Sequence, residues 1–181
     1  MLVKESLVLM SRYNTWMNQR LYETVQVLTP DEFVQDRKAF FGSICGTLNH
    51  LVVADTIWLK RFASHSEDFT ALDAVRHVST PSALNQILFA ELNALRDYRQ
   101  SLDSIIEQWV DSLVETDLDS VLHYTNMKGV TTKKILGQVL LHFFNHQTHH
   151  RGQVTTLLTQ CGLDMGATDL LLLIPDQALA E

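Results

Sequence analysis

Apolar residues recur every three or four positions along four long stretches of the chain, a period typical of helices that bury one face. These stretches are residues 2–28, 43–64, 82–114 and 131–161. Pro81 suits the first turn of the third stretch, whose length is well above that of an ordinary globular helix (about 11 residues) and is typical of a bundle. The pattern therefore predicts an all-α fold built on four helices.

A small β-hairpin is expected before the fourth helix. Residues 121–125 and 130–132 are rich in β-branched and aromatic side chains, and Gly129 between them permits the turn. The hairpin and the connection between the second and third helices are both long enough to cross the bundle. We therefore expect a four-helix bundle with long crossover connections, and a single domain over residues 1–181, because no linker or repeat divides the chain.

Composition narrows the class of protein. The hydrophobic content of 46%, with seven glycines and three prolines, is that of an ordered, helix-rich chain. A net charge of −7 without a basic stripe argues against nucleic-acid binding. No stretch has the pattern of a signal peptide or the ~20 apolar residues of a membrane span, so we expect a cytoplasmic protein without a membrane partner. Two cysteines, Cys45 and Cys161, are too few for a disulfide framework and fit a reducing compartment.

Potential metal-binding side chains are most concentrated in residues 142–153, HFFNHQTHHRGQ, which hold four of the eight histidines. At about 100° per residue, His142, His146, His149 and His150 fall within about 100° of one another on one helix face. Upstream, Ile135 continues the same stripe. Polar imidazoles on a buried seam need either a hydrogen-bond network or a metal ion.

A metal site has a simple geometric basis here. His146 and His150 stand at i and i+4, about 6 Å apart along the axis, so two imidazole nitrogens can converge on one ion. His142 and His150 are about 12 Å apart, too far to serve one ion easily, and a third ligand must come from another helix. His50 lies mid-helix among aliphatic residues. Taken alone, His50 would be interpreted as a histidine of the core. Together with His146 and His150 it completes a set of three imidazoles that could bind a metal ion and leave one of its coordination positions open.

At these residues the chain resembles the DinB/YfiT-like superfamily of bacterial metal-binding bundles, over nearly its whole length. The resemblance rests on three motifs: Tyr13-Asn14-Thr15-Trp16-Met17-Asn18, Leu48-Asn49-His50 followed by Asp55 and Trp58, and Asn145-His146-Gln147-Thr148-His149-His150-Arg151-Gly152-Gln153. It implies a four-helix bundle with crossed connections, commonly a homodimer, holding nickel or zinc on His50, His146 and His150. Some relatives use low-molecular-weight thiols such as bacillithiol or mycothiol in S-transfer reactions, whereas many have no assigned activity.

The residues themselves give a compatible account of the chemistry. Three neutral imidazoles suit Zn²⁺, Ni²⁺ or a similar divalent ion and leave its charge intact. A coordinated water or thiol would then be activated near neutral pH. The pattern of a zinc protease requires glutamate directly after the first helical ligand, and Gln147 stands there instead, which argues against that class.

Three residues are candidates for a general base. His142 and His149 lie beside the proposed ligands, although each could equally orient a ligand or pack against its neighbours. Asp55 falls on an apolar stripe of the second helix. It is a candidate base, or else a residue at the rim of the bundle paired with an arginine such as Arg61 or Arg12.

The sequence therefore predicts a metal-dependent enzyme, a thiol S-transferase or a hydrolase acting on a small molecule. Its expected partners are that substrate, which could be a low-molecular-weight thiol, and a second copy of the chain. The apolar run at residues 170–174 could either close the end of the bundle or contact that second copy. The alternative is a non-catalytic, metal-binding stress-response bundle in which the ion is structural. A third reading, in which the histidines only hydrogen-bond, suffers from mutual repulsion on protonation.

Overall fold

Four long helices form the molecule, as the sequence predicts. The computed structural model describes residues 3–176; residues 1–2 and 177–181 of the expected domain lie outside them. The long helices are α1 (Val3–Val25), α3 (Ile44–Ala63), α5 (Leu92–Ser112) and α7 (Leu136–Gln160). The shorter elements are α2 (Pro30–Val34), η1 (Thr70–Leu72), α4 (Asp73–Arg76), α6 (Glu115–Leu118), β1 (Val121–Thr125), β2 (Thr131–Ile135) and η2 (Leu170–Leu173). The all-α bundle with a small antiparallel hairpin before the last long helix is confirmed.

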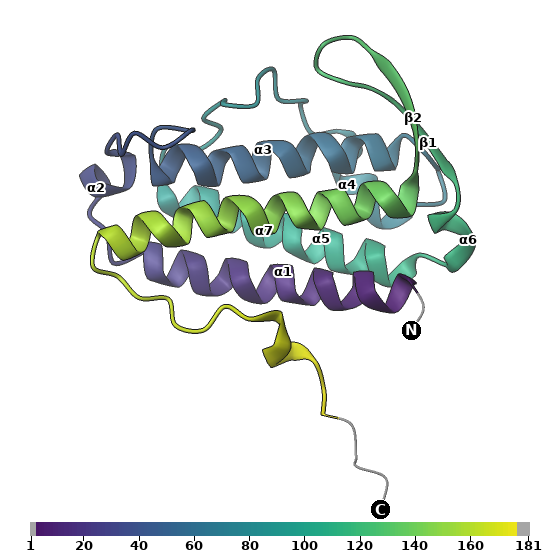
Figure 1. Ribbon diagram of the computed structural model, residues 1–181. Coiled ribbons are helices and arrows are strands. Elements are labelled where there is room, and N and C mark those ends of the chain that lie inside the picture. Colours follow the sequence, from purple (N-terminus) through teal and green to yellow (C-terminus); the bar gives the residue numbers. More distant parts are fainter. Residues whose placement is uncertain (1–2, 177–181) are drawn as a thin grey trace, which may run out of the picture.

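Two long connections cross the bundle, and only one of them is a connection that the sequence predicts to cross. Helices α5 and α7 each pack against both α1 and α3, which places α1 diagonally opposite α3 (Figure 1). The chain therefore crosses between α1 and α3, and again from α5 to α7 through the hairpin. The connection between α3 and α5 joins neighbouring helices, so its predicted crossover role is wrong.

The third helix begins ten residues later than its apolar pattern predicts, at Leu92 rather than Ser82. The segment 81–91 instead runs without regular secondary structure over α3, where the Asn49 side chain replaces helical hydrogen bonds. Its Oδ1 accepts from the backbone N–H groups of Leu88 and Phe89, and its Nδ2 donates to the carbonyl of Phe89. Leu84 and Leu88 have helical spacing, but a buried side-chain amide satisfies this backbone and so competes with helix formation.

The start of α3 is set by a cap and a glycine. Ser43 is the N-cap, and its hydroxyl accepts a hydrogen bond from the backbone N–H of Gly46 at 3.0 Å. A Cβ at Gly46 would lie 2.0 Å from the carbonyl oxygen of Phe41. Glycine therefore allows the chain before the cap to fold closely over the first turn of α3.

The predicted hairpin is present and longer than expected. Strand β2 continues to Ile135, which pairs with Val121, and α7 begins at Leu136 rather than at Thr131 or Thr132. The helix ends at Gln160, and Gly162 adopts a φ of 77°, as a residue just beyond a helix end often does. Within residues 3–176, no helix has the length and apolar character that crossing a membrane would require.

Candidate metal centre

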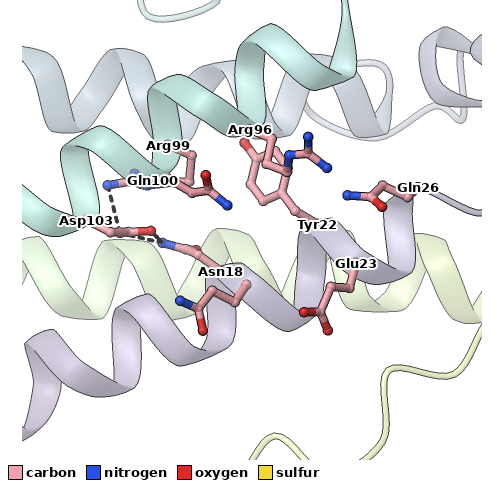
Figure 2. Close-up of a pocket in the computed structure, with 9 residues that line it drawn as sticks. Asn18, Tyr22, Glu23, Gln26, Arg96, Arg99, Gln100 and Asp103 are labelled. Atoms are coloured by element: carbon pink, nitrogen blue, oxygen red, sulfur yellow. Dashed lines mark hydrogen bonds and ion pairs between the residues drawn. The ribbon is translucent and has the colours of Figure 1, made fainter.

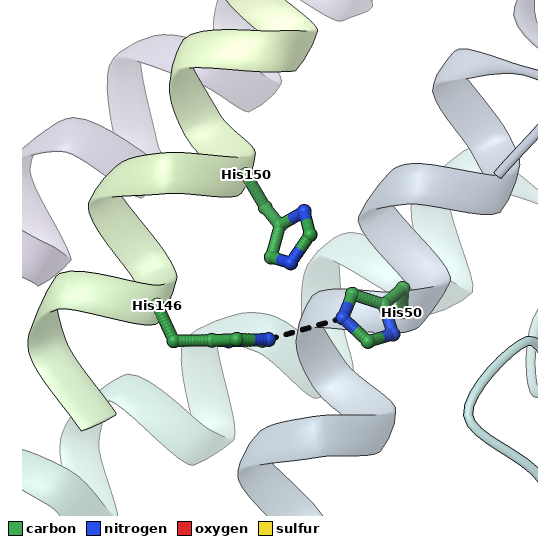
Figure 3. A group of neighbouring side chains, drawn as sticks. All are labelled: His50, His146 and His150. Carbon is green, nitrogen blue, oxygen red and sulfur yellow. Dashed lines mark hydrogen bonds between the residues drawn. The ribbon is translucent and has the colours of Figure 1, made fainter. Parts of the chain in front are cut away.

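Three imidazoles from two helices meet on the inner side of α3 and α7. His50 projects from α3, and His146 and His150 project from successive turns of α7 toward it (Figure 3). The Nε2 atoms of His50 and His146 are 3.1 Å apart, and one nitrogen from each of the three rings lies within 4.8 Å of the others. Nitrogens bound at about 2.0–2.1 Å to a tetrahedral ion lie about 3.3 Å apart. The rings are therefore already close to the spacing that one ion needs.

Backbone and amide oxygens fix the orientation of two of these rings. His50 Nδ1 lies 2.8 Å from the carbonyl oxygen of Leu84, and His150 Nδ1 lies 2.8 Å from Oε1 of Gln153. Because both oxygens can only accept, each Nδ1 carries the proton and each Nε2 keeps a lone pair. Metal-binding histidines are commonly held in this way by an oxygen on the far ring nitrogen.

The surroundings keep the imidazoles neutral. Burial lowers the pKa of His50 to about 4, although its hydrogen bond to Leu84 opposes the shift. Burial, followed by repulsion from the neighbouring imidazoles, lowers the pKa of His146 to about 3. The pKa of His150 is also lowered, chiefly by burial. Neutral imidazoles are the form that binds a divalent cation, so the donor set fits a divalent metal ion at neutral pH.

One side of the cluster is covered and another faces a cavity. The ring of Phe41 stacks on His50 with centroids 3.9 Å apart, and its edge approaches His150 at 5.5 Å. On the other side, a cavity of about 380 Å³ reaches His50 and His146 and is bounded by α3, by segment 81–91 and by the hairpin tip. A small molecule could approach the imidazoles from this cavity.

The two neighbouring histidines occupy different positions. His142 is exposed, contacts Trp58 edge to face at 5.6 Å, and lines the cavity together with His146. His149 is also exposed, but it packs against His150 and lies 3.3 Å from Nε2 of Gln153, outside the lining of that cavity. Of the candidate bases, the structure therefore brings His142 closest to the place where a substrate could lie.

Asp55 does not join the histidines. Its carboxylate forms an ion pair with Arg99 of α5 at 2.5 Å and accepts a hydrogen bond from Gln147 of α7. Asp55 is 1% exposed. The expected position at the rim, paired with Arg61 or Arg12, is wrong, because Asp55 is buried inside the bundle and its partner comes from α5.

Asp55 belongs instead to a buried polar cluster at the centre of the bundle. Arg99 also pairs with Asp103 at 3.0 Å, and Asp103 accepts hydrogen bonds from Nδ2 of both Asn14 and Asn18. Arg151 donates to Oδ1 of Asn14 and completes the cluster. All four long helices contribute to it. Because Gln147 and Arg151 directly follow the two α7 histidines, adjacent positions of one helix serve the polar cluster and the imidazole cluster.

A second hollow lies on the opposite side of this polar cluster, between α1 and α5 (Figure 2). Its volume is about 220 Å³, and Asp103 and Arg99 form part of its wall beside Tyr22. Burial raises the pKa of the Tyr22 hydroxyl, so that group stays protonated. The lining contains no imidazole or thiol. We therefore place the candidate metal centre at the histidines.

Several residues that contact the candidate metal centre cannot be predicted from the sequence. The carbonyl of Leu84 carries no side-chain signature, and it is free to contact His50 because segment 81–91 is not helical. Phe41 lies in a connection whose path a periodicity cannot predict. Gln153 shares the face of the histidines at i+3 from His150, a spacing that does indicate contact on a helix.

The model of the family described as "DinB family" matches residues 1–178. Protein DinB of Bacillus subtilis (strain 168) is 27% identical over 158 residues, which are 87% of each chain. The crystal structure of a DinB-like protein from Bacillus cereus ATCC 10987 superposes with a TM-score of 0.54 at 17% identity, covering 84% of this chain and 91% of that one. The structural match concerns the fold alone.

Proposed function

The chain belongs to the DinB family, and on that premise we propose that His50, His146 and His150 bind a divalent metal ion, zinc or nickel, in an enzyme acting on a small molecule. The proposed reaction is S-transfer from a low-molecular-weight thiol or hydrolysis. The observation that carries the proposal is the convergence of three neutral imidazoles beside a cavity, with the lone pairs of His50 and His150 set by the oxygens of Leu84 and Gln153.

An ion held by neutral ligands keeps its full charge and would lower the pKa of a bound thiol or water. The protein supplies the surroundings of that chemistry. Phe41 covers one side of the imidazoles, and the cavity admits the substrate on the other side. We assign the role of general base to His142, whose imidazole nitrogen would accept the proton that the thiol or water releases. In an S-transfer, the thiol sulfur forms the new bond to an electrophilic carbon, and the leaving group departs with the electron pair of the broken bond.

Metal content tests the first step. The untagged protein should contain close to one equivalent of zinc or nickel by elemental analysis, and His50→Ala, His146→Ala and His150→Ala should each lose it. His149→Ala is the matched control, because this exposed histidine of α7 lies outside the set. If the His146→Ala protein kept its full metal content, the proposed site would be wrong.

Activity tests the second step. The metal-loaded protein should transfer a low-molecular-weight thiol to an electrophile, or hydrolyse a small ester or amide, in a substrate screen. His142→Gln should lower kcat and leave metal content unchanged, because it removes the base without removing a ligand. Unchanged kcat in that variant would refute the assignment of His142.

A structural role for the ion is the second candidate, because its ligands would tie α3 to α7. In that case the protein would be the non-catalytic, metal-binding stress-response bundle that the sequence offers as the alternative to an enzyme. Chelation separates the two functions. A large loss of thermal stability, with no activity in the screen, would favour the structural ion, whereas a stable metal-free protein points to a functional site.

A further inference from the structure

The cavity beside the histidines has a charge opposite to that of the chain. The protein carries 21 acidic and 14 basic residues. The lining of the cavity nevertheless includes Arg61 of α3 and Lys128 of the hairpin tip, and no aspartate or glutamate. An adjoining hollow of about 420 Å³, which shares Trp58 and His142 with the first, adds Lys134 and again no carboxylate. A positive lining in an acidic protein favours an anionic occupant.

Arg61 is the best placed of these cations. Its guanidinium lies over the rings of Trp58 and Tyr124, with its central carbon 4.7 and 4.8 Å from their centroids. It donates one hydrogen bond, to the carbonyl oxygen of Thr125 at 3.2 Å. Within residues 3–176, no carboxylate lies within 4 Å of this guanidinium. A half-buried cation that is fixed by aromatic rings, with N–H donors to spare, can bind a carboxylate.

The walls between Arg61 and the imidazoles are mostly apolar. Ile57, Leu84 and Met127 line the same cavity, with the ring of Trp58 beside Arg61. Trp58 follows His50 by eight residues of α3, which corresponds to about 12 Å along the axis. An occupant that reaches both ends therefore has a charged end, an apolar middle and a reactive end.

We propose that Arg61 binds a carboxylate of the substrate, so that the proposed enzyme acts on small molecules in which an apolar segment separates a carboxylate from the reacting group. This inference rests on the proposed function for the identity of the reacting end. The carboxylate site itself is defined by Arg61 and its aromatic support, and it can be tested without turnover.

The test compares hexanoate with hexanol, two probes of similar length that differ in charge. Binding is followed by NMR titration at the indole N–H of Trp58, in both zinc-loaded and zinc-free protein. We expect hexanoate to bind about tenfold more tightly than hexanol, as a charge-assisted hydrogen bond would give. Arg61→Gln should abolish that preference, and Arg61→Lys should restore part of it. Arg12→Gln, which removes the same charge from an exposed position of α1, should retain it.

Each result that differs from these expectations shows which of the two proposals is wrong. Equal binding of the two probes to the unmodified protein would overturn the proposal. A preference that appears only with zinc and survives Arg61→Gln would also overturn it, because the carboxylate would then be bound to the ion. Absence of bound zinc, with an Arg61-dependent preference for hexanoate, would refute the proposed function and leave the carboxylate site standing.

Discussion

Replacing Arg99 by methionine should destabilise the protein more than any comparable surface change. The Arg99 side chain is 2% exposed and lies between the carboxylates of Asp55 and Asp103, at 2.5 and 3.0 Å. With Arg151, these groups form a cluster of two positive and two negative charges. Methionine would leave two buried carboxylates with one remaining cation. The replacement therefore converts a neutral cluster into one with a net negative charge.

The magnitude follows from the burial of the partners. Breaking a buried ion pair from one side costs about 3–5 kcal/mol, because the remaining charge stays desolvated. For a domain of this size, each kcal/mol lowers Tm by about 2–4 °C, so Arg99→Met should lower Tm by about 6–20 °C. The free energy of unfolding should be measured by urea denaturation at neutral pH, with Tm measured alongside.

Arg96 provides the matched control one turn earlier on α5. Among residues 3–176 its one ion pair is with the exposed Asp97, at 3.6 Å, and surface pairs contribute at most about 1 kcal/mol. A loss in Arg99→Met no greater than that in Arg96→Met would refute the reasoning. Adding Asp55→Asn to Arg99→Met should cost less than the sum of the two single changes, because the second change removes one of the stranded charges.

Three further predictions concern the site and its supports. Gln153→Ala should weaken zinc binding about tenfold in a chelator competition, because His150 loses the oxygen that orients it. Gly46→Ala should displace the ring of Phe41 from the histidines and lower Tm, because its Cβ would meet the Phe41 carbonyl oxygen at 2.0 Å. Burial raises the pKa of Asp103 to about 6 from 3.8, so the folded state holds this proton more tightly than the unfolded state. The contribution of Asp103 to stability should therefore fall as pH rises from about 4 to about 6, and denaturation of Asp103→Asn should show a flatter pH dependence in that window.

Controls for these three come from exposed positions of α5 and α7. Gln160→Ala should leave zinc affinity unchanged, and an equal effect of both glutamine changes would contradict the role of Gln153. Gly152→Ala should be harmless, because its Cβ would meet nothing within 4 Å, so equal destabilisation by both glycine changes would show that the contact with Phe41 is not the cause. Asp111→Asn should keep the pH dependence of the unmodified protein.

Hydrophobic periodicity predicted the helices wherever burial alone decides the structure. It located all four long helices, because their apolar faces pack against one another, whereas the mostly exposed hairpin was predicted from its β-branched residues and Gly129. It failed at segment 81–91, where Leu84 and Leu88 imitate helical spacing and the Asn49 side chain holds the backbone in another form. The order in which helices cross the bundle also escaped it, since connection length does not say which neighbours are joined.

The residues of the candidate site likewise divide into those that the sequence predicts and those that it does not. The i, i+4 pair on α7 and the histidine of α3 could be found from residue type and spacing. Contacts made by the backbone, such as the carbonyl of Leu84, and by residues in irregular segments, such as Phe41, could not. Asp55 stands out in the sequence as a carboxylate on an apolar stripe, but its pairing with Arg99 depends on a packing arrangement that the sequence does not state.

The neighbouring positions on α7 restrict how the protein could adapt to ions of different size. Gln147 and Arg151 anchor α7 to the polar interior, one residue beyond His146 and His150. The spacing of the α7 pair is set by one helical turn. Turning or sliding the helix to move that pair relative to His50 would break those anchors. The position of the α7 pair is therefore fixed, and adjustment is left to the third ring. His50 is steadied by a carbonyl on a segment without regular secondary structure, so substitutions in residues 81–91 should be the most direct way to retune ion preference without disturbing the bundle.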